Sequence, residues 1–228
     1  MIGEENSNEP IVENVENNFI PKTFFWMFLG LLGTAIVAWY TYTSGLFVNI
    51  LSGGSFGVLL IVEVIVVLLF SFLFRKLSPT LVGILYFIYA AINGVTLSTI
   101  FIIFDLKSIV LLFVASSLLF GGLALYGYKT SKDLSNWHTI LFGTLFVGLI
   151  ISIINLFVGN SMLDLALDWV ILLVFFGITA YDMNKIKQLY LLDGLDKSKL
   201  HIYGAMELYL DFINIFIRIL SIFGKRRD

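Results

Sequence analysis

The chain has 228 residues, of which 59% are hydrophobic and 13% charged, and its mean hydropathy is +0.96. Soluble domains carry about 25% charged residues, so this composition predicts an integral membrane protein with little chain left for a separate soluble domain. The net charge of −2 gives no reason to expect a nucleic-acid partner, and the absence of cysteine excludes disulfides, thiolate metal sites and cysteine nucleophiles.

The N-terminal segment MIGEENSNEPIVENVENNFI is acidic and rich in asparagine. No basic residue precedes Lys22, so the segment lacks the basic region that begins a signal peptide, and the apolar run after it is too long for the core of one. We therefore expect residues 1–20 to form a flexible acidic tail and residues 21–228 to form a single transmembrane domain.

The hydrophobic segments predict an all-α bundle. A helix needs about 20 apolar residues to cross the hydrocarbon of a bilayer. Six segments meet this requirement clearly, at about 23–44, 56–74, 80–104, 108–128, 138–158 and 165–183. A seventh, at about 201–223, is weaker because polar residues interrupt it. The turns between the segments are short, so the helices are expected to pack together.

The seventh segment contains the stretch MELYLDFINIFIRIL, residues 206–220. Its polar residues Glu207, Asp211, Asn214 and Arg218 are spaced by four, three and four positions, which places them on one stripe of a helix. Glu207 and Arg218 lie near the ends of the segment, where long side chains can reach the interface. Asp211 is harder to explain, because apolar residues flank it on both sides.

The basic residues predict the orientation. The loops after the second, fourth and sixth segments hold eight basic residues: Arg75, Lys76, Lys129, Lys132, Lys185, Lys187, Lys197 and Lys199. The loops on the other face hold only Lys107. Basic loops stay in the cytoplasm, so we expect the N-terminus there and the protein in the inner, or plasma, membrane. A seventh crossing would place Lys225, Arg226 and Arg227 outside, against this rule. Either the last segment turns back within the membrane, or the basic residues of the other loops set the orientation despite this tail. The length of the last segment favours a full crossing.

Small residues recur every four positions in the third segment, at Ala90, Gly94 and Ser98. Such spacing lets another helix backbone approach closely.

Three acids, Glu63, Asp182 and Asp211, stand out within the apolar segments, and Asn155 is a further polar residue there. An ionisable side chain at the bilayer centre costs a few kcal/mol, so it usually faces a bundle interior or a water path. Asp182 has a simpler alternative, because it could be an interfacial residue paired with Lys185. His138 and His201 are far apart in sequence. We expect each to lie at a membrane interface and not at a metal site.

The two aspartates can act together. The sixth segment ends near Asp182, and Asp211 lies about ten residues, or about 15 Å, into the seventh. If the seventh helix is tilted or begins with a loop near the membrane, the carboxylates can meet. Two adjacent carboxylates cannot easily both ionise, so they share a proton. They could also bind a hard cation such as calcium, which prefers oxygen ligands.

Four blocks carry a family resemblance, namely NGVTLS at 93–98, KTSKDLS at 129–135, AYDMNKIK at 180–187 and LYLDFINIF at 208–216. From about residue 20 to its end, the chain resembles the Bax inhibitor-1 family, also called the transmembrane Bax inhibitor motif family, and most closely its bacterial YetJ-like and YccA-like members. The resemblance implies seven transmembrane helices, with six wrapped around a central C-terminal helix. On that fold the polar stripe would face protein and water.

The resemblance also implies a function. Bacterial members are associated with a pH-sensitive calcium leak governed by two aspartates that share a proton, and these match Asp182 and Asp211. A basic residue at the inner end of the second helix acts as a latch for the pair. Arg75 is the nearest candidate. Its position relative to Glu63 is displaced by about one residue from the family pattern, so Lys76 is an alternative. Glu63, Glu207, Asn155 and Asn214 are candidates for an ion path.

Two other classes of function stay open. A membrane regulator could bind and inhibit a membrane protease through the tail at residues 1–20. An intramembrane aspartyl protease would use Tyr181-Asp182 and Asp211, which echo paired motifs of presenilin-like enzymes. However, Leu208-Tyr209-Leu210 stands where those enzymes have Gly-x-Gly, and without the glycines a substrate backbone could not approach as closely. We therefore expect no enzymatic activity. The expected partners are lipid, calcium and protons, with the protease as the alternative.

Overall fold

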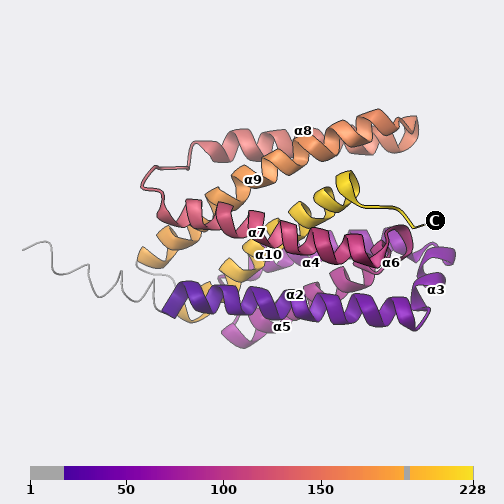
Figure 1. The fold of residues 1–228 in the computed structure, drawn as a ribbon. Coiled ribbons are helices and arrows are strands. Elements are labelled where there is room, and N and C mark those ends of the chain that lie inside the picture. The colour runs from indigo at the N-terminus through magenta and orange to yellow at the C-terminus, as the bar shows by residue number, and fades with distance from the viewer. Residues whose placement is uncertain (1–17, 193–195, 228) are drawn as a thin grey trace, which may run out of the picture. The chain divides into compact units, whose positions relative to one another are not determined.

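The computed structural model describes residues 18–192 and 196–227, so most of the predicted tail at residues 1–20 lies outside the described residues. The described chain is helical and joined by short turns, and its only strand-like contact is a bridge between Phe104 and Arg226. The helices in Figure 1 are α2 (Ile20–Thr43), α3 (Leu46–Ser52), α4 (Ser55–Leu73), α5 (Pro79–Leu97), α6 (Ile100–Ile103), α7 (Leu106–Lys129), α8 (Trp137–Val158), α9 (Ser161–Leu191) and α10 (Lys197–Phe223). The predicted all-α class is confirmed.

Six stretches of the described chain are long and apolar enough to cross a membrane: α2, α4, residues 79–103, α7, α8 and α9. They coincide with the six clear segments expected from the sequence, so this is a multi-pass membrane protein. The seventh segment forms a helix too, α10, which is less apolar and is not among the six. Whether seven helices cross, with α10 at their centre, stays a prediction.

Helix α9 is longer than predicted. It continues to Leu191, whereas the apolar segment was expected to end at residue 183. The polar residues in the extension have partners on α7: Asn184 Nδ2 donates to Gly127 O at 3.3 Å, and Lys187 Nζ donates to Tyr128 O at 3.2 Å. These carbonyls belong to the last turn of α7 and have no acceptor role inside that helix. The extension therefore satisfies two carbonyls that would otherwise need water.

Short-range signals set several helix boundaries. Pro79 occupies the first turn of α5, and the Ser78 hydroxyl accepts a hydrogen bond from Leu81 N. Asp105 caps α7 by accepting from Lys107 N at 2.8 Å and Ser108 N at 3.1 Å. The short helix α3 was not predicted. It is apolar but has only 7 residues, and left-handed glycines begin both α3 and α4, with φ of 75° at Gly45 and 69° at Gly54.

The contacts divide the chain into two compact units. The described part of the first comprises residues 18–103, 189–192 and 196–209, and that of the second comprises residues 104–188 and 210–227. Helix α10 therefore contributes its first half to one unit and its second half to the other. A single domain over residues 21–228 would require the two units to pack together, and it stays a prediction.

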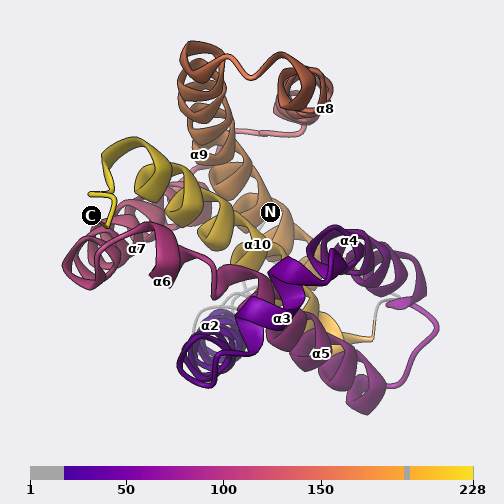
Figure 2. The ribbon, with the colours of Figure 1, turned by 90° about the vertical axis from the view of Figure 1, so that its right-hand side faces the viewer.

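In the first unit, α2 packs closely along α5 (Figure 2). The buried residues of α2 recur at helical spacing: Thr23, Met27, Gly30, Thr34, Ala38 and Thr41. A Cβ atom at Gly94 of α5 would lie 2.7 Å from Thr34 O and 2.9 Å from Val37 Cβ. The close approach expected along Ala90, Gly94 and Ser98 is thus confirmed at Gly94, and α2 is the helix that approaches.

Hydrogen bonds tie the first half of α10 to both of these helices. Thr34 Oγ1 donates to Ala90 O at 2.9 Å, and the Tyr209 hydroxyl lies 2.6 Å from Thr34 Oγ1. The same hydroxyl lies 3.0 Å from Asn93 Oδ1, and it donates in that bond. Buried polar groups in lipid need such partners, so the network fixes the register of α10 against α2 and α5.

The second unit contains α7, α8, α9 as far as Gln188 and the second half of α10. An aromatic cluster of Phe113, Phe120, Phe212 and Phe216 joins α7 to α10, with ring centroids 5.1–5.7 Å apart across the two helices. Helix α8 runs beside α9 (Figure 1), where Gly148 meets the side chain of Ile171 and Gly177 meets Leu141. The backbone of Gly127 lies directly against Ala180 of α9.

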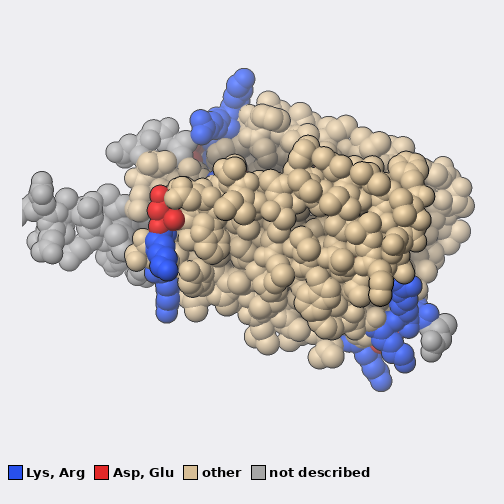
Figure 3. Space-filling view, turned by 90° about the horizontal axis from the view of Figure 1, so that it is seen from above, with Lys and Arg blue, Asp and Glu red and all other residues tan. Residues whose placement is uncertain are grey.

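One face of the molecule carries few charged side chains. On the face shown in Figure 3, the visible Lys, Arg, Asp and Glu side chains of the described residues gather towards the ends, and the broad area between them carries none. Large apolar side chains such as Leu118, Phe157 and Phe72 are exposed on the spans. In water such a surface would be costly, so its natural environment is lipid.

Candidate functional site

Asp182 lies in α9 and is only 3% exposed. The Lys185 ammonium, one turn further on, lies 3.7 Å from Asp182 Oδ1. The expected Lys185 pairing is therefore present, but the carboxylate itself is buried and not at an exposed interface. Because α9 continues to Leu191, Asp182 stands nine residues inside the helix end, and the prediction that this helix ends beside it is wrong.

Asp211 lies in the second half of α10 and is 2% exposed. Its neighbours Leu208 and Phe212 are buried as well. Both aspartates belong to the second unit. Measured from the connection between the two helices, Asp182 is nine residues deep and Asp211 is fourteen, because α10 begins at Lys197 and not at residue 201. The difference in depth is about 7.5 Å at 1.5 Å per residue, roughly half of what the sequence suggested.

The proposed latch residue, Arg75, is exposed in the turn that follows α4 and belongs to the first unit. Its carbonyl accepts a hydrogen bond from Lys199 Nζ at 3.1 Å, and Leu77 O accepts another from the same ammonium at 2.7 Å. Lys76, the alternative, is exposed in the same turn. A contact between either side chain and the aspartates stays a prediction.

Glu63 lies half-buried in α4, and its carboxylate interacts with the side chains of Thr96 and Asn93 on the α5 side of the first unit. Its Oε1 atom is buried, and no hydrogen-bond partner for that atom occurs among the described residues. The side chain therefore faces a neighbouring helix, as a charged or polar residue in lipid requires. Its part in an ion path stays a prediction.

The other residues assigned to an ion path have local partners. Asn155 Nδ2 donates to Asn160 O at 2.9 Å and to Asp164 Oδ1 at 2.5 Å, while its Oδ1 accepts from Asn160 N at 3.2 Å. These bonds hold the turn between α8 and α9 and account for a buried amide without any ion. Asn214 Nδ2 donates to Leu210 O one turn back in α10. Glu207 is half-buried in the same helix.

Sequence analysis missed Asp168, which is buried in α9 of the second unit. Its Oδ1 accepts from Arg218 Nη1 at 2.5 Å, and its Oδ2 accepts from the Ser221 hydroxyl. Arg218 therefore has a protein partner inside the unit and does not simply snorkel to the interface. Asp168 falls three residues after the start of the segment predicted at 165–183, where an acid looks interfacial. The signal that could have found it was Arg218 itself, which needed a counter-ion.

We expect Asp168→Asn to destabilise the protein by about 1–3 kcal/mol, because it leaves the Arg218 guanidinium partly buried without its counter-ion. The value is below that of a fully buried pair, since the Arg218 side chain is 30% exposed. The apparent melting temperature in detergent measures the effect. Asp168→Asn combined with Arg218→Gln should recover part of the loss, and Ser221→Ala should cost less than either single change. Strictly additive losses in the double variant would show that the pair does not couple.

Among the described residues, no three His, Asp or Glu side chains gather closely enough to form a metal site. A calcium ion held by Asp182 and Asp211 stays a proposal.

Comparisons with known proteins indicate the family to which the chain belongs. A family profile described as "Inhibitor of apoptosis-promoting Bax1" matches residues 16–228. The inner membrane protein YbhL of Escherichia coli K12 is 38% identical over 215 residues, which cover 92% of each chain. An uncharacterised protein of Rickettsia prowazekii is 35% identical over 92% of this chain and 90% of its own, and one of Borreliella burgdorferi is 32% identical over 94% of each. This membrane protein therefore belongs to the Bax inhibitor-1 family.

Proposed function

We propose that the protein is a pH-sensitive calcium leak channel of the membrane, gated by Asp182 and Asp211 sharing a proton. One observation carries the proposal: two carboxylates that sequence reasoning paired are both almost wholly buried, in neighbouring helices α9 and α10 of one unit. Burial disfavours a double negative charge, and a second carboxylate nearby disfavours it further. Between them, the pair would hold one proton at neutral pH.

The smaller difference in depth also supports the pairing. With about 7.5 Å between the two positions along their helices, a moderate tilt is enough to bring the carboxylates together. Lys185 offsets part of the charge on Asp182, which would help a singly charged pair persist. A protease-binding role would use the N-terminal tail, most of which lies outside the described residues, so that role stays a prediction.

The proposal includes α10 as a seventh crossing. Lys199 bonds to the α4–α5 turn, so α10 begins at the membrane face that carries this turn. At the other end, Asp105 N donates to Lys225 O, so α10 finishes beside the turn between α6 and α7. If residues 79–103 cross the membrane, the two turns would lie on opposite faces, which supports a full crossing by α10. The 27 residues of α10 measure about 40 Å, enough to cross.

Site-directed labelling tests this topology, since the chain has no native cysteine. With the N-terminus in the cytoplasm, Lys132→Cys should react with an impermeant maleimide only from the inside, and Lys107→Cys and Arg227→Cys only from the outside. Reaction of Lys132→Cys only from the outside would reverse the orientation. If Arg227→Cys reacted from the same side as Lys132→Cys, α10 would turn back within the membrane.

The channel itself is tested with purified protein in liposomes that contain a calcium-sensitive dye. Calcium entry should exceed that of protein-free liposomes and should change with pH between about 6 and 8, where a coupled carboxyl pair can titrate. Calcium entry equal to that of empty liposomes at every pH would contradict the proposed function.

A further inference from the structure

Basic residues gather at one end of the second unit, beside the start of α7. They are Lys107, Lys225, Arg226 and Arg227, all exposed. Lys225, Arg226 and Arg227 belong to the chain after α10, and Lys107 to the first turn of α7. We call Lys107, Lys225, Arg226 and Arg227 the basic cluster.

The backbone holds this cluster in place. Asp105 N donates to Lys225 O at 3.0 Å, and Lys225 N donates to Ser108 Oγ at 3.1 Å. Arg226 forms the bridge with Phe104. A Cβ atom on Gly224 would overlap the ring of Phe104, so only glycine lets the chain lie this close to the start of α7. The basic side chains therefore project from a fixed segment.

Among the residues that the structure describes, one acid, Asp105, lies beside the basic cluster. The pKa of Asp105 lies below its ordinary value. The largest cause is the hydrogen bond from the Ser108 hydroxyl, followed by that from the Ser108 N–H, and the charge of Lys225 contributes to the same shift. Asp105 is thus an anion whose lone pairs already serve the start of α7. The cluster keeps an excess of positive charge.

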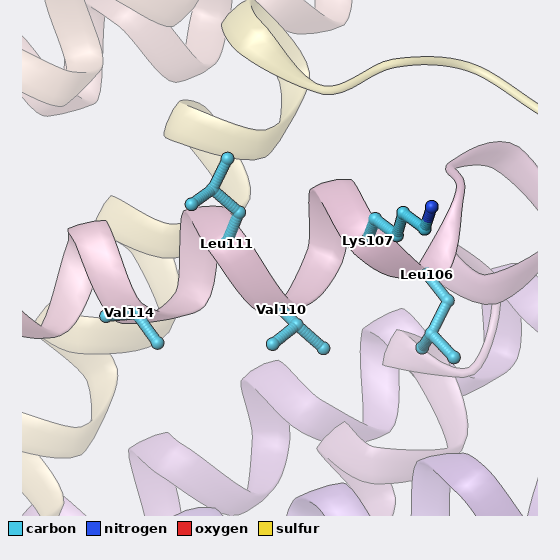
Figure 4. A pocket seen from close by; sticks show the side chains of 5 residues that line it. All are labelled: Leu106, Lys107, Val110, Leu111 and Val114. Carbon is cyan, nitrogen blue, oxygen red and sulfur yellow. The ribbon is translucent and has the colours of Figure 1, made fainter.

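A groove of about 660 Å³ opens beside the cluster on α7 (Figure 4). It is lined by Leu106, Lys107, Val110, Leu111 and Val114. Four of these are apolar and exposed, and Lys107 belongs both to the groove and to the basic cluster. Because α7 is a membrane span, the apolar part of the groove lies where acyl chains are, and its basic end lies at the start of the span, where headgroups are.

We propose that the groove and the basic cluster together bind one anionic phospholipid, with an acyl chain along α7 and the phosphate at Lys107 and Arg226. The chemistry is complementary at both ends: branched aliphatic side chains for the chain, and fixed cations for the headgroup. A zwitterionic lipid offers the same chain but carries its own cation, so it gains less from the cluster. Each basic residue near a headgroup favours the anionic lipid by about fivefold.

A tryptophan in the groove reports which lipid occupies it. Leu111→Trp replaces a groove residue that is 69% exposed, and the matched control Leu118→Trp replaces one that is 75% exposed on the same helix outside the groove. Both proteins are reconstituted in vesicles of phosphatidylcholine with phosphatidylglycerol, and quenching by brominated acyl chains is compared for the two lipids. The four native tryptophans contribute equally to both proteins.

We expect brominated phosphatidylglycerol to bind at residue 111 at least fivefold more strongly than brominated phosphatidylcholine, and no preference at residue 118. Lys107→Gln with Arg226→Gln, or 1 M salt, should reduce the preference to about one. Lys129→Gln, at the opposite end of α7, should leave it unchanged. Equal preference at residues 111 and 118 would overturn the proposal. So would the absence of quenching at residue 111, because protein would then cover the groove.

Discussion

Asp211→Asn and Asp182→Asn should each flatten the pH dependence of calcium flux. In the wild type, one proton more or less on the pair changes the relative stability of the closed and open packings, and a shift of one pKa unit corresponds to about tenfold in that equilibrium. Asparagine keeps the shape of the side chain but removes the coupled titration. We therefore expect each variant to change its flux by less than about twofold between pH 6 and 8, whether the channel is left leaky or shut.

Asp133→Asn is the matched control, because Asp133 is exposed in the turn before α8 and caps Ser135 N at 2.8 Å. It should reconstitute normally and keep the wild-type profile. If the two buried variants fold, reconstitute and retain that profile while the wild type leaks calcium, the shared-proton gate is wrong and the leak itself stands. If none of the proteins leaks, the proposed function fails at an earlier step.

Gly127→Ala should be the most destabilising of the conservative glycine substitutions in the second unit. A methyl group there would overlap the backbone of Ala180 in α9, and backbone atoms cannot move aside as a flexible side chain can. Overpacking costs about 1–3 kcal/mol, and we expect the upper end of this range, which lowers the apparent melting temperature by about 5–10 °C. The added methyl group would push α7 and α9 apart, which would also strain the hydrogen bonds from Asn184 and Lys187 to the end of α7.

Gly122 provides the control on the same helix. It is exposed, and a Cβ atom at that position would meet no atom within 4 Å outside its own helix. Gly122→Ala should be neutral or slightly stabilising, because alanine favours helix over glycine by about 1 kcal/mol. Equal melting temperatures for the two variants would show that α7 and α9 are not in backbone contact at Gly127.

The sequence predicted well what depends on local pattern. Six apolar segments became six helices that can span a membrane, and the spacing of Ala90, Gly94 and Ser98 correctly indicated a close helix contact. Apolar length and small-residue period are properties of one segment, so they can be read without a partner. The burial of Asp211 followed in the same way, from the apolar residues on both sides of it.

What depends on a second segment was harder to predict. The end of α9 was placed too early because its polar residues look like a loop until the carbonyls of α7 are known. The partners of Asn155 could not be predicted, because Asn160 and Asp164 belong to the next turn and helix, and its part in an ion path stays a prediction. Asp168 was overlooked for the same reason, since only its contact with Arg218 distinguishes it from an ordinary interfacial acid.

The hydrogen bonds of α10 have a consequence for how the protein enters the membrane during synthesis. Helix α10 is synthesised after the six candidate spans, and it is not apolar enough to rank with them. Two of its polar side chains have partners on helices made earlier, Tyr209 on Thr34 and Asn93, and Arg218 on Asp168. Insertion of α10 should therefore be post-translational in part and dependent on those helices already lying in the bilayer. A nascent chain carrying Tyr209→Phe and Arg218→Leu should enter the membrane with less help from them.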